Sequence, residues 1–150
     1  MKLFQIEEPD GSPGDPEAPG AAVGIDASGR LATVAVAVGG NAATLADREG
    51  FACDLPVPGL EGDWHALLEG AKLRAERSLS RPVTHAVLVL ADAPDRALAA
   101  RLLNASAAAG LELLRLMPAG EVPAGEAPAE AAAIVAEDLA PRPDTLIGPA

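Results

Sequence analysis

The chain has 150 residues, a formal net charge of −11 and a single cysteine, Cys53. This length suits one domain with a sizeable core, and one cysteine excludes an intrachain disulfide and favours the reducing cytoplasm. The negative charge repels phosphate backbones and anionic lipids, and an aromatic content of 2% leaves few rings to stack on bases. No apolar run approaches the roughly 18–20 residues that cross a bilayer. We therefore expect neither nucleic acid nor a membrane as a partner.

The N-terminal region differs in composition from the rest of the chain. Residues 7–20, EEPDGSPGDPEAPG, are rich in proline, glycine and acidic residues and have no periodicity, which is typical of disorder. We therefore predict a disordered leader over residues 1–20 and one folded domain over residues 21–140. Residues 141–150, which begin with a proline, are expected to form a short C-terminal tail.

Three strands are predicted at the start of the domain. Residues 21–26 and 31–38 are apolar runs whose Val, Ile and Thr side chains suit a buried, pleated surface, and a polar corner at 27–30 joins them. The sequence Gly-Gly-Asn at 39–41 tolerates positive φ and therefore predicts a hairpin turn. A third, alanine-rich strand is expected over residues 42–46.

The remaining elements alternate between helix and strand. Asp63 is an N-cap residue by type and precedes a stripe of apolar residues at helical spacing. Pro94 is expected in the first turn of the second helix, where proline is tolerated. The predicted ranges are a helix over 64–79, a strand over 84–91, a helix over 94–109, a strand over 111–117 and a helix over 128–139.

The order of these elements is β-β-β-α-β-α-β-α. Three antiparallel strands followed by right-handed βαβ crossovers give a mixed five-stranded sheet with helices on both faces. The sequence therefore predicts an α/β fold with the ribonuclease-H-like topology.

Several segments resemble one family. VGIDASGRLATVAVAV resembles the first phosphate-binding hairpin of the Hsp70/actin/sugar-kinase ATPase superfamily, which reads roughly I-D-L-G-T-T-x-S-x-x-A-V. AGLELLRLM and EAPAEAAAIVAEDL are similar to the "AGLEVLRLINEP" strand and the "NEPTAAALAYGL" helix of Hsp70 chaperones. The similarity spans about residues 21–139 and implies the first half of an Hsp70-type ATPase domain.

The resemblance implies roles for residues of the first hairpin. In the family, the aspartate at the strand end orders the metal ion and its water, which implies that role for Asp26. The turn after it surrounds the phosphates with backbone N–H groups and hydroxyls, and Ser28, Gly29 and Arg30 occupy that turn here. This turn lacks the Gly-Thr-Thr character of the family, so we expect phosphate binding to be degenerate.

A glutamate before the last helix completes the implied catalytic set. Glu126 matches the family's glutamate that helps to position the attacking water, and Glu121 remains an alternative match. The second phosphate loop and the adenosine pocket have no counterpart in these residues. We therefore expect a nucleotide to find only half a cleft.

Each carboxylate also has a simpler interpretation. Asp26 could cap the N–H groups of its turn, and Glu126 could be a solvated acid near a helix N-terminus. A third possibility is that Asp26 and Asp92 hold a metal ion with further carboxylates, as in a two-metal nuclease. The further candidates for that cluster are Glu69, Glu76 and Asp138. His65 and His85 are too few and too far apart in sequence for a zinc site.

The leading functional hypothesis is a minimal, single-lobe Hsp70-like protein that acts as a non-catalytic scaffold or regulatory binding module and needs no cofactor. The first alternative is a weak binder of Mg-ATP, or an ATPase, that completes its cleft with a second ATPase-like lobe. The second alternative is a ribonuclease-H-like metal-dependent nuclease. We also expect a homodimer that uses residues 128–139, where Ile134, Val135 and Leu139 interrupt a run of alanines, together with the strand ends near Asp26 and Asp92. The alternative is that the sheet already covers the alanine-rich face of this helix.

Overall fold

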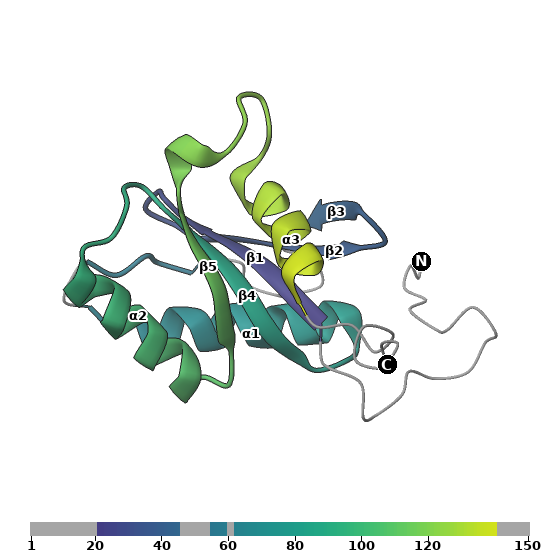
Figure 1. The fold of residues 1–150 in the computed structure, drawn as a ribbon. Coiled ribbons are helices and arrows are strands. Elements are labelled where there is room, and N and C mark those ends of the chain that lie inside the picture. The colour runs from purple at the N-terminus through teal and green to yellow at the C-terminus, as the bar shows by residue number, and fades with distance from the viewer. Residues whose placement is uncertain (1–20, 46–54, 60–61, 141–150) are drawn as a thin grey trace, which may run out of the picture.

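The structure is a computed structural model that describes residues 21–45, 55–59 and 62–140. The predictions for the leader, for Cys53 and for the C-terminal tail concern residues outside these ranges. The described elements are β1 (Ala21–Ala27), β2 (Thr33–Val38), β3 (Asn41–Thr44), α1 (Trp64–Leu79), β4 (Val83–Leu90), α2 (Arg96–Ala108), β5 (Glu112–Pro118), the short 3-10 helix η1 (Ala119–Glu121) and α3 (Pro128–Leu139) (Figure 1).

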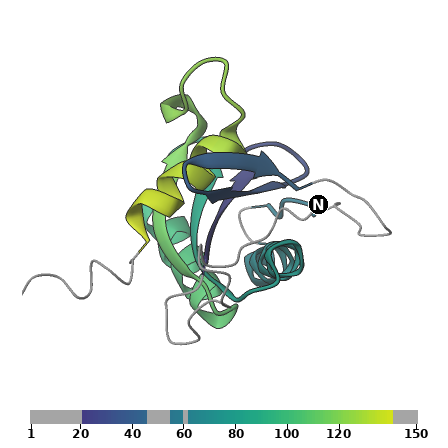
Figure 2. The same ribbon diagram turned by 90° about the vertical axis from the view of Figure 1, so that its right-hand side faces the viewer.

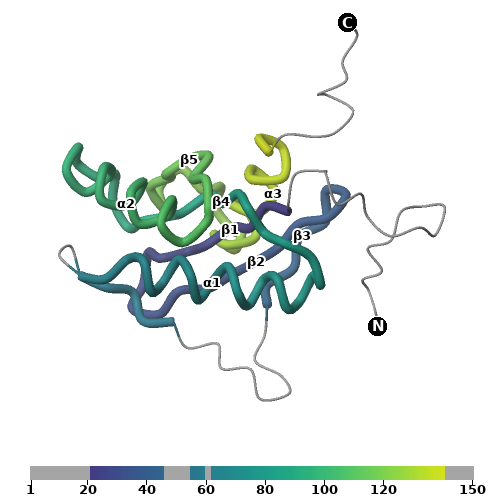
Figure 3. The backbone as a smooth tube through the Cα atoms, turned by 90° about the horizontal axis from the view of Figure 1, so that it is seen from below, coloured from purple at the N-terminus to yellow at the C-terminus, as the bar shows by residue number. Residues whose placement is uncertain are grey.

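The strands form one mixed sheet in the order β3-β2-β1-β4-β5. β1 pairs antiparallel with β2, and β2 pairs antiparallel with β3, whereas β1 pairs parallel with β4, and β4 pairs parallel with β5. α1 and α3 lie on opposite sides of this sheet (Figures 2 and 3). The predicted α/β, ribonuclease-H-like mixed sheet with helices on both faces is confirmed. Within the described ranges, no helix is both long enough and apolar enough to cross a membrane.

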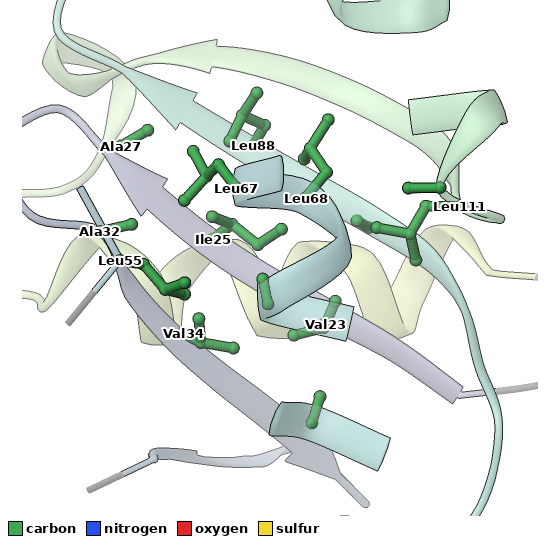
Figure 4. Close-up of a cluster of buried hydrophobic side chains, with 14 of the residues drawn as sticks. Val23, Ile25, Ala27, Ala32, Val34, Leu55, Leu67, Leu68, Leu88 and Leu111 are labelled. Atoms are coloured by element: carbon green, nitrogen blue, oxygen red, sulfur yellow. The ribbon is translucent and has the colours of Figure 1, made fainter. Parts of the chain in front are cut away.

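The main core lies between the sheet and the layer formed by α1 and α2. Alternate residues of β1, Val23 and Ile25, point into it together with Leu88 of β4 and with Leu67 and Leu68 of α1 (Figure 4). The period of two along β1 is what a strand with one face on this core requires. Each fully buried Val, Leu or Ile contributes about 1.5–3 kcal/mol to the free energy of unfolding.

The opposite face of the sheet is covered by α3 through small side chains. Gly24 of β1 lies under the helix backbone: a Cβ atom placed there would come within 2.3 Å of the Ala133 nitrogen and 2.4 Å of the Ala129 oxygen. The alanine-rich side of α3 is therefore buried against the sheet, and its exposed large apolar residues are Ile134 and Leu139. The buried alanines are Ala129, Ala131, Ala132, Ala133 and Ala136.

Two carboxylates of α3 hold the β2–β3 hairpin. Gly39 and Gly40 form its tip with φ of +62° and +84°, and their N–H groups donate to Glu137 Oε2 and Oε1 at 2.7 and 2.9 Å. Thr44 Oγ1 donates to Glu130 Oε2 at 2.8 Å. The last helix thus connects to the edge of the sheet through polar side chains as well as through the alanines.

The predicted start of the second helix is wrong. α2 begins at Arg96, and Asp95 is its N-cap, with a side chain that accepts a hydrogen bond from Leu98 N at 2.8 Å. Because the aspartate satisfies an N–H group of the first turn, the helix begins after it, and Pro94 lies before the cap. α1 and α3 have the predicted bounds, and Asp63 caps α1 by accepting from Ala66 N at 3.1 Å.

Several strand boundaries also differ from the prediction. β2 begins at Thr33 rather than at Leu31, because Leu31 pairs instead with Pro56 in an isolated bridge. β3 begins one residue early, at Asn41, where the hairpin turn already closes onto Val38. β4 begins at Val83 and ends at Leu90, each one residue earlier than predicted.

Candidate functional site

Most of the predicted site residues lie at one edge of the sheet. β1, β4 and β5 are parallel, so their carboxyl ends meet at the same edge. Asp26 is the next-to-last residue of β1, and Asp92 lies two residues after β4. Ala129 of α3 lies over Gly24 while Ala136 packs near Ala22. α3 therefore runs antiparallel to β1, and its N-terminus points to the edge that holds Asp26.

Asp26 caps the turn that follows it. Ser28 N donates to Asp26 Oδ1 at 2.9 Å, and Ser28 Oγ donates to the same oxygen at 2.6 Å. Such an Asx turn forms when an aspartate accepts from the backbone two residues further on. One carboxylate oxygen thus accepts hydrogen bonds from both donors of Ser28. In this geometry Asp26 caps its own turn.

The rest of the corner is braced by a neighbouring segment. Ala32 N donates to Leu55 O at 2.7 Å, and Val57 N donates to Arg30 O at 2.9 Å. Gly29 and Arg30 are exposed. Gly29 does not have a left-handed φ, and a Cβ placed on it would have Leu31 O, at 4.0 Å, as its nearest neighbour. The fold therefore does not itself require a glycine at this position.

The two candidate glutamates lie in the segment between β5 and α3. Glu121 ends η1 and forms an ion pair with Arg115, with 3.3 Å between Nη2 and Oε1. Glu126 is exposed, and its N–H donates to Pro123 O at 3.2 Å in a turn just before α3. Of the two, Glu126 lies nearer in sequence to the N-terminus of α3.

The carboxylates considered for a nuclease are not brought together. Glu76 lies at the opposite edge, where it accepts from Val83 N at 2.9 Å and from Lys72 Nζ at 2.5 Å. Asp138 is close to the C-terminus of α3, which also points away from Asp26. Among the residues that the structure describes, no three His, Cys, Asp or Glu side chains gather closely enough to hold a metal ion.

The surroundings of Glu76 change its pKa. Burial raises the pKa of Glu76, but the hydrogen bonds from Lys72 and from Val83 N, together with the positive charge of Lys72, outweigh burial and lower the pKa below its ordinary value. Glu76 thus joins the end of α1 to the first residue of β4. This role is structural, because Glu76 lies far from the corner at Asp26.

The sequence reasoning missed two arrangements. The hairpin tip at Gly39 and Gly40 binds Glu137, and His85 of β4 lies beside Glu112 of β5. The first joins residues 97 and 98 positions apart, which no local pattern indicates. The contact between His85 and Glu112 follows from the register of the parallel strands β4 and β5, and the predicted strand ranges did not determine that register.

A comparison of the chain with protein-family models and with curated proteins found no match. The resemblance to the Hsp70-type half ATPase domain remains a prediction from the sequence.

Proposed function

We propose that the described domain is a non-catalytic binding module, an Hsp70-type half ATPase lobe that acts as a scaffold or regulatory partner. The observation that best supports this function is the closed corner at Asp26. A phosphate-binding turn must present its N–H groups and hydroxyls to the anion. Ser28 instead directs both of its donors to Asp26 Oδ1.

The closed corner disfavours phosphate for an energetic reason. To bind phosphate, Ser28 would have to give up two hydrogen bonds to a charged acceptor, and such bonds contribute about 1.5–3 kcal/mol each when they are well shielded. A loss of about 3 kcal/mol in total corresponds to a roughly hundredfold weaker affinity. The Asp26 carboxylate would also repel the incoming anion unless a cation lay between them.

Calorimetry with Mg-ATP tests this proposal. We expect no binding tighter than about millimolar, either for the original chain or for Asp26→Ala, in which the donors of Ser28 are released. Asp95→Asn is the matched control, because asparagine keeps the N-cap of α2. A micromolar isotherm for the original chain that persists in Asp95→Asn but disappears in Asp26→Ala would overturn the proposal.

The second candidate function is a weak nucleotide site that a second lobe completes. It is favoured by the placement of Asp26, Asp92 and Glu126 around the carboxyl edge of the sheet, with the N-terminus of α3 pointing to the same edge. In this candidate, Mg-ATP would bind with Asp26 and Asp92 near its metal ion and with the corner Ser28–Arg30 near its phosphates. The calorimetric outcome that overturns the first proposal supports this one.

A binding module of this kind requires a protein partner. We propose that the partner is a second copy of the chain or a second ATPase-like lobe, bound through the exposed side of α3. Ile134 and Leu139 leave 36% and 48% of their surface exposed there, and apolar surface of this kind is often covered by association.

A further inference from the structure

A groove lies beside the first residues of β5, where β4 also begins and α2 ends. It has a volume of about 520 Å³, and its apolar lining includes Leu103, Ala107 and Leu113. The buried polar side chains of the groove already have partners in the domain. Ser106 Oγ donates to Leu103 O at 2.9 Å, and His85 Nδ1 shares a hydrogen bond of 2.8 Å with Thr84 Oγ1. These side chains therefore need no ligand, and the groove offers mainly apolar surface.

The helix beside this groove is only partly covered. α2 packs against α1 and β5 and lies on the β5 side of the sheet (Figures 1 and 3). Its buried residues are Leu102 and Ser106, whereas α1 buries six residues. Leu103 leaves 49% of its surface exposed. α2 thus has apolar surface that could cover one strand more than the sheet contains.

The strand beside the groove has a free side. In the order β3-β2-β1-β4-β5, β5 is an edge strand that pairs with β4, and no other strand of the described ranges pairs with its outer side. An edge strand presents unpaired N–H and C=O groups that accept a further strand. The outer side of β5 and the groove beside α2 together form a site for an extended segment with apolar side chains.

A segment of this kind precedes the domain. Residues 1–6, MKLFQI, carry all the large apolar side chains of the first 20 residues: Met1, Leu3, Phe4 and Ile6. Lys2 is the one basic residue in the same stretch. Phenylalanine and isoleucine favour strands, whereas residues 7–20 are rich in proline, glycine and acidic residues. The first six residues therefore form a segment distinct from the connection that follows them.

The connection is long enough to reach the groove. β1, β4 and β5 are parallel, so they begin at the same edge of the sheet, and two strand spacings separate the starts of β1 and β5 by about 10 Å. Residues 7–20 join the segment to β1, and a chain of that length extends up to about 50 Å. A segment joined through a short linker has an effective concentration on the order of a millimolar, so a modest affinity is sufficient.

We propose that residues 1–6 add to the outer side of β5 as a parallel strand, with Lys2 beside Glu112. The Glu112 side chain is 71% exposed, so its carboxylate is accessible to a lysine. An antiparallel strand would instead bring Glu7 and Glu8 towards Glu112, and like charges side by side are destabilising. Charge therefore selects the parallel direction.

The alternation of side chains directs the rest of the segment. Leu113 packs against the main core, on the side of α1 and α2, so its neighbour Glu112 points to the opposite side of the sheet. With Lys2 on the side of Glu112, the flanking residues Met1 and Leu3 point to the α2 side. Their apolar side chains then cover the exposed wall of α2.

Hydrogen exchange of the full chain, measured by mass spectrometry, tests the proposal. The amides of β5 should exchange at least about tenfold faster in Leu3→Asp, because a charge facing α2 prevents docking and frees the strand edge. Ser12→Asp is the matched control: it adds the same charge within the connection and should leave the exchange of β5 unchanged. Leu3 lies outside the domain, so the amides of β1 should stay protected in both variants and show that the fold is intact.

Lys2 and Glu112 give an independent readout. Lys2→Glu and Glu112→Lys should each accelerate the exchange of β5, whereas the double variant should restore the slow exchange of the original chain. A local structural effect of Glu112→Lys would not be rescued by a change at Lys2.

A disulfide identifies the occupant of the groove. A Cys53→Ser background removes the one thiol of the chain. In this background, Leu3→Cys with Leu103→Cys should form an intrachain disulfide on mild oxidation. Ser12→Cys with Leu103→Cys is the control and should form it at least about tenfold more slowly.

Three results would overturn the proposal. The first is equal exchange of β5 in Leu3→Asp and in the original chain, and the second is the absence of rescue in the double charge variant. The third is a disulfide that forms only between chains, which would assign the groove to a second copy. The groove lies at the opposite edge of the sheet from Asp26, so these results leave the proposed function untouched.

Discussion

Gly24 of β1 lies directly under Ala133 of α3, since a Cβ atom on Gly24 would lie 2.3 Å from the Ala133 nitrogen. Gly24→Ala should therefore force α3 away from the sheet. We expect a loss of at least about 2 kcal/mol in the free energy of unfolding, at the upper part of the range for overpacked cores, measured by urea denaturation. Gly29→Ala is the matched control, because the nearest neighbour of a Cβ there is Leu31 O at 4.0 Å, and it should change stability by less than about 0.5 kcal/mol. Equal stability of the two variants would contradict this packing.

The link between Glu137 and the hairpin tip gives a second prediction. Glu137→Gln removes the charge that two N–H groups of Gly39 and Gly40 share, and a charge-assisted bond is stronger than a neutral one. We expect a loss of about 1 kcal/mol, discounted for the exposed position of the tip. Amide hydrogen exchange at Gly39 and Gly40 should become faster, as NMR would show. Glu126→Gln, at an exposed turn, should leave these amides unchanged, and unaltered exchange in Glu137→Gln would show that the link does not hold the tip.

The fold was predictable to the extent that local patterns determined it. The stripe of apolar residues after Asp63 identified a helix, and the alternating order of predicted strands and helices determined the topology. The ends of helices and strands depended on contacts that the sequence alone does not reveal. The Asp95 side chain caps α2, so this helix begins later than predicted, and the bridge between Leu31 and Pro56 makes β2 shorter than predicted.

The candidate site was predictable only as a set of strand ends. The sequence placed Asp26 at the end of a buried strand, and the parallel order of β1 and β4 brings Asp92 to the same edge. The sequence left open whether Ser28 donates to a phosphate or to Asp26, because a phosphate-binding turn and a turn capped by Asp26 can both be formed by residues 27–30. The pairing of His85 with Glu112 depends on the register between β4 and β5, which shifts between Ala86 and Val87 and which periodicity alone does not show.

Stability should depend on pH through Glu76. Its pKa is lowered in the folded protein from an ordinary value of 4.5, because hydrogen bonds from Lys72 and Val83 outweigh the opposing effect of burial. A group with a lowered folded pKa contributes stability that is present above its unfolded pKa and is lost as the pH falls through the folded value. We therefore expect Glu76→Gln to destabilise the protein at pH 7 and to have much less effect well below pH 4.5.

Chemical denaturation at several pH values checks this dependence. Glu69→Gln, on the exposed side of the same helix, is the control and should lower stability little at any pH. If Glu76→Gln and the original chain differed by the same free energy at pH 7 and at low pH, the hydrogen bonds to Glu76 would not depend on its charge.

The last prediction concerns association through α3. Because the alanines of this helix are covered by the sheet, a dimer must use the outer side, where Ile134 and Leu139 are exposed. Val135 is half-buried against the core, so Ile134→Glu perturbs the surface with less risk to the fold. We expect light scattering on a size-exclusion column to give twice the chain mass of 15.0 kDa at high micromolar concentration, and Ile134→Glu to give a folded monomer.

Leu73→Glu, at a 52% exposed leucine on α1, is the control and should remain dimeric. A mass near 15.0 kDa for the original chain would rule out the dimer, and a folded dimer of Ile134→Glu would place the interface on another face of the domain.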